Sequence, residues 1–140
     1  MSFSYEYTVQ FRDTDAAGVV YFASILSICH IAYEASLTQS GIDLKLFVNN
    51  SEFAVPIFHV SANFLKPLFC GDRVIIKLTP KQLDNWRFEI SYKIEMIKDE
   101  PIDRALISAT ATTNHVVINP RTRNRKELPE LIVNWLAEWG

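Results

Sequence analysis

Two carboxylates and a glycine stand immediately before a segment with a helical pattern. Asp13, Asp15 and Gly18 precede residues 22–37, whose apolar positions recur every three or four residues. The first N–H groups of a helix lack acceptors within it, and the helix dipole favours negative charge there. A carboxylate beside such donors suits acyl transfer, as a nucleophile or base next to an oxyanion hole. The simpler interpretation is that both aspartates only form the turn and cap the helix.

The helical segment has an apolar stripe and a defined end. The stripe consists of Phe22, Leu26, Cys29, Tyr33 and Leu37. Gly41 follows it and suits the left-handed conformation that closes a helix. Because Cys29 lies in the stripe, we expect it to be a small buried hydrophobe and not a reactive thiol. Neither Cys29 nor Cys70 stands in a metal-ligand pattern, so we expect no metal site.

The composition indicates one folded domain without a nucleic-acid surface. The chain has 140 residues, of which 49% are hydrophobic and 12% aromatic, so a single domain over residues 1–140 can bury a sizeable core. The net charge is −2, whereas a nucleic-acid surface carries a basic excess. No apolar run reaches the length of a membrane span, and no basic-then-apolar leader opens the chain. We therefore expect a cytoplasmic protein that binds no nucleic acid and spans no membrane.

Alternation of apolar and polar residues predicts strands at 4–12, 55–65, 73–79, 86–96 and 103–118. In the first strand one face is expected to hold Tyr5, Tyr7, Val9 and Phe11. In the second strand an apolar face with Phe58, Val60, Ala62 and Phe64 is expected opposite a polar face with His59, Ser61 and Asn63. The last strand is rich in Ala, Ser and Thr, which leaves room for close packing against the helix.

Two further segments complete the predicted fold. Residues 42–52 are expected to form an irregular or briefly helical connection with its apolar residues Leu44, Leu46, Phe47 and Val48 packed. Leu128-Pro129-Glu130 opens a C-terminal helix, because proline is accepted in a first turn. The fold class is therefore α+β, with a curved antiparallel sheet around one long central helix. The other face of the sheet is solvated or covered by a partner.

Residues 11–22, which read FRDTDAAGVVYF, resemble the active-site signature of the hotdog-fold acyl-CoA thioesterases of the 4-hydroxybenzoyl-CoA thioesterase type. Residues 64–72, FLKPLFCGD, resemble the turn between the second and third strands of that family. The predicted order of strands and helices matches the hotdog fold over almost the whole chain. The resemblance implies hydrolysis of an acyl-CoA substrate without a cofactor, in a homo-oligomer (dimer or tetramer) whose sites lie at the seam between subunits.

The resemblance also implies roles for individual residues of the turn. Asp15 falls on the catalytic carboxylate of the family, which acts as a nucleophile that forms a mixed anhydride or as a general base on water. The backbone N–H of Phe22, at the helix N-terminus, polarises the thioester carbonyl. Gly18 serves backbone conformation or close substrate approach, and Tyr21 stands where other members have a histidine. Asp13 is interpreted as holding the turn.

The remaining candidates come from the predicted faces. His59 and Asn63 are expected to bind substrate, together with Gly18 and Tyr21, by contacting a substrate hydroxyl; solvent contact is the alternative for His59. Flat faces for an aromatic substrate are expected from Tyr21, Phe22, Phe47 and Phe58. Lys66, Arg87, Arg121, Arg123 and Arg125 are candidates for the CoA phosphates, with a solvated surface as the alternative for each. His30 is expected to be structural, and Glu34 to form an ion pair or an oligomer contact.

Within the family, the stretches DTDAAGVVYF and CHIAYE are similar to those of the cyanobacterial 1,4-dihydroxy-2-naphthoyl-CoA hydrolases of phylloquinone synthesis. This similarity implies an aromatic acyl-CoA substrate. Two alternatives stay open: a general short- or medium-chain acyl-CoA thioesterase, and a non-catalytic hotdog dimer that binds acyl-CoA or a carrier protein. Retention of Asp15 argues against the binder, which would not need the carboxylate.

Overall fold

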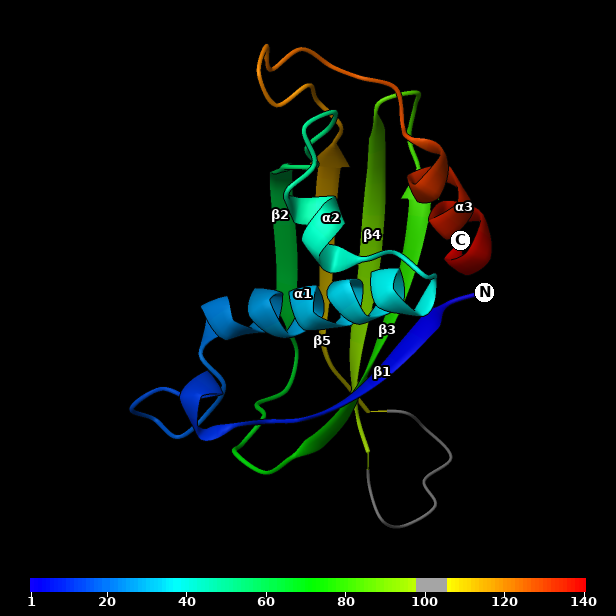
Figure 1. Ribbon diagram of the computed structural model, residues 1–140. Helices are drawn as coiled ribbons and strands as arrows, with labels where there is room; N and C mark the ends of the chain where they lie inside the picture. Colours follow the sequence, from blue (N-terminus) through cyan, green and yellow to red (C-terminus); the bar gives the residue numbers. More distant parts are fainter. Residues whose placement is uncertain (98–105) are drawn as a thin grey trace.

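The computed structural model describes residues 1–97 and 106–140, and one antiparallel sheet organises them (Figure 1). Its strand order is β1-β3-β4-β5-β2. The strands are β1 (Phe3–Thr8), β2 (Ile57–Phe64), β3 (Arg73–Gln82), β4 (Arg87–Met96) and β5 (Leu106–Val116). The long helix α1 (Phe22–Gln39) lies across one face of the sheet. The predicted α+β class is confirmed, whereas the expected start of the last strand, residues 103–105, lies outside the described residues.

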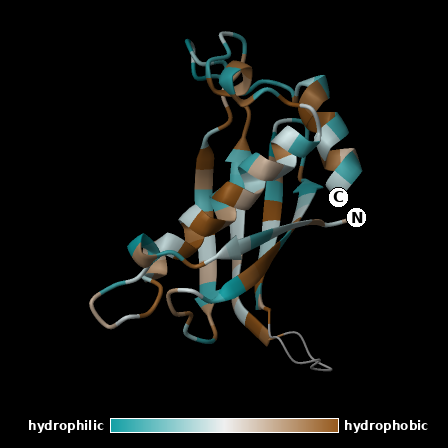
Figure 2. Ribbon diagram, turned by 60° about the horizontal axis from the view of Figure 1, so that its bottom comes forward, coloured by the Kyte–Doolittle hydropathy of each residue, from teal (hydrophilic) through white to brown (hydrophobic). Residues whose placement is uncertain are grey.

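The core lies between α1 and the sheet, and α1 buries a wider face than the predicted stripe. Figure 2 shows apolar segments along the part of α1 that crosses the sheet. The buried residues of α1 are Ile25, Ile28, Cys29, Ala32, Tyr33, Ser36 and Leu37. Phe22 was expected in the stripe but is 61% exposed, because the first turn of α1 extends past the edge strand β2 (Figure 1). Burial raises the pKa of Cys29 to about 12, consistent with a buried hydrophobe.

The N-terminal strand is shorter than its alternation predicts. It ends at Thr8, and a 3-10 turn over Phe11–Asp13 follows. The buried carboxylate of Asp13 accepts hydrogen bonds from the hydroxyl of Tyr7 at 2.7 Å and from the backbone N–H of Gln10 at 2.8 Å. These bonds turn the chain, so the prediction that Phe11 shares the buried face was wrong, and its side chain is 86% exposed. Asp13 holds the turn as expected.

Strand β2 forms one edge of the sheet. Within the part of the chain that the structure describes it pairs with β5 alone, and all of its residues are exposed except Ala62, which is half-buried. The exposed side chains include Phe58, Val60 and Phe64, each more than 40% exposed. An edge strand with exposed apolar side chains can pair with another chain.

Two short helices cover the ends of the core. In α2 (Leu44–Val48), Leu44 and Phe47 pack against the core, but Leu46 and Val48 are more than 65% exposed, so their expected packing was wrong. A helix so short has one side to bury.

Helix α3 (Glu130–Trp139) begins after Pro129, as predicted, and buries Trp135, whose indole N–H donates to the hydroxyl of Ser36 at 2.9 Å. None of the described helices has the length and apolar character of a membrane-spanning segment. The cytoplasmic location stays a prediction.

Candidate active site

A tight turn presents the carboxylate of Asp15. The N–H of Asp15 donates to the carbonyl of Val19 at 2.9 Å, and the carbonyl of Asp15 accepts from the N–H of Gly18 at 3.0 Å. One carboxylate oxygen accepts from the N–H of Ala17 at 2.8 Å, while the side chain as a whole stays exposed. Gly18 has a φ of 83°, which L side chains rarely adopt, so the conformational role expected for this glycine is met.

Backbone hydrogen bonds attach this turn to two neighbouring segments. The N–H of Tyr21 donates to the carbonyl of Asp13, and the N–H of Val20 donates to the carbonyl of Leu68, both at 2.8 Å. Asp13 therefore orients the start of α1, and Leu68 fixes the distance from the turn to the segment after β2. A carboxylate placed by backbone contacts is held in one geometry without help from flexible side chains.

The N-terminus of α1 has free donors. Tyr21, the residue directly before the helix, caps it with no side-chain hydrogen bond, and the first turn contains no acidic residue. Among the described residues, the N–H groups of Phe22 and Ala23 donate no hydrogen bond. Uncapped amides at a helix N-terminus favour a negatively charged oxygen. The N–H of Phe22 is thus available for the role that the resemblance implies.

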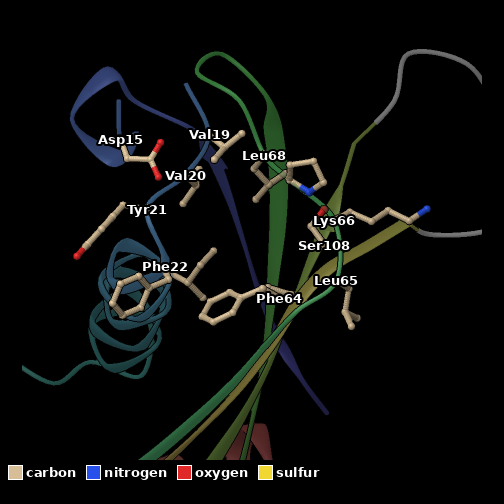
Figure 3. Close-up of a pocket in the computed structure, with 13 residues that line it drawn as sticks. Asp15, Val19, Val20, Tyr21, Phe22, Phe64, Leu65, Lys66, Leu68 and Ser108 are labelled. Carbon is tan, nitrogen blue, oxygen red and sulfur yellow. The ribbon is translucent and has the colours of Figure 1, made fainter. Parts of the chain in front are cut away.

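Asp15 and Phe22 line a pocket of about 450 Å³ (Figure 3). One wall is the turn and the first helical residues; the other is the segment that follows β2, with the start of β5. The lining residues are Asp15, Val19, Val20, Tyr21, Phe22, Ile25, Phe64, Leu65, Lys66, Pro67, Leu68, Ser108 and Ala109. Most of these side chains are apolar.

Aromatic rings gather beside the carboxylate. The rings of Tyr21 and Phe22 lie 4.6 Å apart between centroids, and those of Phe22 and Phe64 lie 6.4 Å apart, edge to face. All three side chains are between 45% and 61% exposed, although large aromatic side chains usually bury most of their surface. Exposed flat faces around a pocket are suited to an aromatic ligand.

The pocket unites some of the predicted site residues and not others. It contains Asp15, Tyr21 and Phe22, and Gly18 belongs to the adjoining turn. His59 and Asn63 do not line it. Phe64 faces the pocket, and side chains alternate along a strand, so both residues project from the other face of β2.

Contacts of the neighbouring residues agree with that placement. The amide of Asn63 donates to the hydroxyl of Thr110 on β5 at 3.3 Å.

Phe47, expected near the substrate, lines a separate cavity of about 510 Å³ under α2. Phe58 lies instead beside Arg87, whose guanidinium carbon is 6.0 Å from the ring centroid.

Of the five basic candidates for CoA phosphates, Lys66 lines the pocket. Arg87 binds Asp84, with its Nε 2.7 Å from the carboxylate, and this hydrogen bond lowers the pKa of Asp84. Arg123 lines the cavity under α2, and Arg125 lies over the ring of Trp86.

His30 and Glu34 form an exposed pair on α1, at 3.6 Å between Nε2 and Oε1. This contact agrees with the ion pair expected for Glu34. Within residues 1–97 and 106–140, no group of three or more His, Cys, Asp or Glu side chains could hold a metal ion.

Ser108 was missed as a site residue. The sequence shows a strand of small residues, from which we expected only close packing. Ser108 is buried, it is one of the residues that line the pocket, and its hydroxyl has no hydrogen-bond partner in the described part of the chain. No local pattern identifies it, because its orientation depends on the pairing of β5 with β4.

Comparisons with known proteins agree with this geometry. The 1,4-dihydroxy-2-naphthoyl-CoA hydrolase of Crocosphaera subtropica is 52% identical over 133 residues, which are 95% of this chain and 94% of the relative. The hydrolase of the same name from Nostoc punctiforme is 48% identical over 136 residues, 97% of this chain and 87% of the relative.

A solved 1,4-dihydroxy-2-naphthoyl-CoA thioesterase from Synechocystis superposes with a TM-score of 0.90 and 36% identity, over 99% of this chain and 97% of that one. This likeness confirms the hotdog fold and the family recognised from residues 11–22. The family profile described as "Thioesterase-like superfamily" matches residues 9–136. The chain therefore belongs to the Thioesterase-like superfamily.

Proposed function

We propose that the protein hydrolyses an aromatic acyl-CoA, 1,4-dihydroxy-2-naphthoyl-CoA, to the free acid and CoA. The observation that carries the proposal is the joint placement of the Asp15 carboxylate and the unpaired N–H of Phe22 in one apolar pocket. Relatives at about 50% identity carry the name of this hydrolase, which supports the choice of acyl group.

The chemistry follows from the two groups. The N–H of Phe22 donates to the thioester oxygen and stabilises the negative charge that develops there when the carbonyl carbon is attacked. Asp15 acts as the nucleophile or as the general base. As nucleophile it forms a mixed anhydride, CoA leaves as the thiolate and takes a proton, and water then cleaves the anhydride. As base it removes a proton from the attacking water, and the thiolate leaves from the tetrahedral intermediate. Both routes consume one water and give the same products.

The aromatic rings support an aromatic acyl group over an aliphatic chain. Tyr21, Phe22 and Phe64 offer flat faces beside the carboxylate. A fused ring stacks against such faces, whereas an extended acyl chain needs a long apolar tunnel.

We also propose that the protein is at least a dimer, formed through the edge of β2. The exposed apolar side chains of this strand lie next to the pocket, because Phe64 belongs to both. Antiparallel pairing of two copies of β2 would bring the partner's strand start close to Phe64 and cover the pocket from that side. The tetramer, and substrate contacts of His59 and Asn63, stay predictions.

A panel of acyl-CoA substrates tests the proposed function. Release of CoA thiol is measured for 1,4-dihydroxy-2-naphthoyl-, benzoyl-, hexanoyl- and palmitoyl-CoA, and kcat/KM is compared. We expect the dihydroxynaphthoyl substrate to exceed both aliphatic ones by more than tenfold. An aliphatic preference of tenfold or more assigns a general thioesterase, and binding without turnover of any substrate assigns a non-catalytic protein.

A further inference from the structure

A β-bulge at Ser108 brings this residue into the lining of the pocket. In the pairing of β4 with β5, Ile94 lies opposite Ala109, while the next residue, Glu95, lies opposite Ile107. Ser108 is therefore an extra residue in β5. In a regular strand Ser108 would alternate with Ala109 and point away from α1. Both residues instead line the pocket, as expected where a bulge redirects a side chain.

The hydroxyl of Ser108 is held in place but has no partner. Ser108 is 1% exposed, and no acceptor or donor in the described part of the chain reaches its hydroxyl oxygen. Its carbonyl accepts hydrogen bonds from the N–H groups of Leu65 and Lys66, at 2.9 and 3.1 Å, which fix the backbone. Buried polar groups are nearly always paired, because an unpaired one destabilises the fold. A ligand that enters the pocket can supply the missing partner.

Ser108 lies on the wall opposite Asp15, next to Lys66 (Figure 3). If the thioester carbonyl lies between Asp15 and Phe22, the acyl group and the CoA arm must extend from it in different directions. The aromatic rings of Tyr21, Phe22 and Phe64 are suited to the acyl end. Lys66 extends outward from the opposite wall and offers a cation for phosphates, so the thiol arm is expected to leave past Ser108.

We infer that the Ser108 hydroxyl hydrogen-bonds the amide of the CoA arm that is nearest the thioester sulfur. The inference rests on the proposed function. The two carbons between sulfur and this amide are methylenes, so the amide is the first group along the arm that can pair with a buried hydroxyl. A hydroxyl both donates and accepts, and it therefore suits either the N–H or the carbonyl of an amide. Ser108 then helps to position the thioester relative to Asp15.

Ser108→Ala, Ser108→Cys and the control Ser91→Ala test the inference. Ala removes the hydroxyl, Cys replaces it with a slightly larger thiol that is a weaker donor, and Ser91 is an exposed serine of β4 outside the pocket. Three thioesters of the same aromatic acid are compared: those of CoA, of N-acetylcysteamine, which retains the amide, and of pentanethiol, which lacks it. We expect both Ser108 variants to lower kcat/KM by about 3- to 10-fold on the first two thioesters, the range for one neutral hydrogen bond. The pentanethiol ester should be unaffected, and Ser91→Ala should match wild type on all three.

Stability separates binding from a structural role. Ser108→Ala removes an unpaired buried hydroxyl, so its unfolding midpoint should equal or exceed that of wild type. A lowered midpoint, an equal loss of kcat/KM on all three thioesters, or no loss on any of them overturns the inference.

Binding of free CoA keeps the inference separate from the proposed function. Free CoA carries the same amide and needs no hydrolysis. We expect its Kd to rise about 3- to 10-fold in Ser108→Ala and to stay unchanged in Ser91→Ala. If wild type turns over none of the thioesters, the proposed function fails, and this binding comparison alone decides the inference: an unchanged Kd in Ser108→Ala overturns it.

Discussion

Phe22 and Phe64 come from opposite walls of the pocket, and their rings meet edge to face at 6.4 Å between centroids. One ring extends from Phe22, whose backbone N–H is proposed to hold the thioester oxygen, and the other from the exposed edge strand β2. This aromatic contact therefore links the proposed catalytic groups to the strand edge at which we propose that two chains pair. A substrate ring that enters beside Asp15 must pack against this pair.

Removal of either ring should lower kcat/KM selectively for aromatic substrates. Phe22→Ala keeps the backbone N–H, and Phe64→Ala leaves the strand intact, since both side chains are more than half exposed. An aromatic contact contributes about 0.5–1.5 kcal/mol, so kcat/KM for the dihydroxynaphthoyl substrate should fall about 2- to 13-fold. Phe11→Ala removes an exposed ring outside the pocket and should have no effect. Equal losses in all three variants would contradict the role of the ring pair.

Substitution of Asp13 should lower the stability of the fold, whereas substitution of Asp15 should lower activity. The buried carboxylate of Asp13 accepts two hydrogen bonds, from Tyr7 and Gln10. Both bonds end on the same oxygen, Oδ2, so Asp13→Ala leaves two donors without their acceptor, and we expect the free energy of unfolding to fall by about 1.5–3 kcal/mol. Asp43→Asn is the control, because asparagine caps a helix as well as aspartate does. Urea denaturation of both variants decides the matter, and equal stabilities would show that Asp13 does not hold the turn.

His115 should make the fold sensitive to mild acid. Its ring is 1% exposed, stacks on Phe88 and contacts the hydroxyl of Thr113 at 2.8 Å. Burial, with a smaller contribution from His30, lowers the pKa of His115 from 6.5 to about 3. Between these values the unfolded chain binds a proton that the folded chain does not. The stability from the neutral ring is therefore complete above pH 6.5 and is lost as the pH falls towards 3.

The size of this effect can be measured with His115→Gln. From pH 7 to pH 5 the single titration removes about 2 kcal/mol from the free energy of unfolding of wild type. The glutamine variant lacks the titrating group, so its loss over the same interval should be smaller by about that amount. Parallel losses in the two proteins would exclude His115 as the group responsible.

The edge of β2 should determine the oligomeric state. Light scattering at micromolar concentration should give the mass of two or four chains. Val60→Lys places a charge on the apolar face of the edge and should shift the protein towards one chain, with loss of activity. Val133→Lys, a similar change on an exposed residue of α3, should keep the wild-type mass. A wild-type mass of one chain contradicts the proposed dimer.

Local chemistry explains which features could be predicted from the sequence. The turn around Asp15 and the start of α1 at Phe22 depend on residues close together in the chain, namely Gly18 with its positive φ and the helical period that follows. The prediction that Phe11 lies on the buried face was wrong, and the cause is also local. Hydrogen bonds to the side chain of Asp13 end the strand, although the alternation of apolar and polar residues continues.

Features that depend on pairing between distant segments could not be predicted. The inward orientation of Ser108 follows from a shift in the register of β4 against β5. Alternation places His59 and Asn63 correctly on one face of β2, but it does not say which face lines the pocket. That face is set by where α1 and the segment around Leu68 lie.

The most direct test of the account is the single-turnover rate of Asp15→Asn on 1,4-dihydroxy-2-naphthoyl-CoA. Asparagine keeps the shape and the exposed position of the side chain, but it is neither a nucleophile nor a base. We expect an unfolding midpoint equal to that of wild type and a rate of thiol release lower by about 100- to 10,000-fold. A folded Asp15→Asn protein that releases thiol within tenfold of the wild-type rate would contradict it.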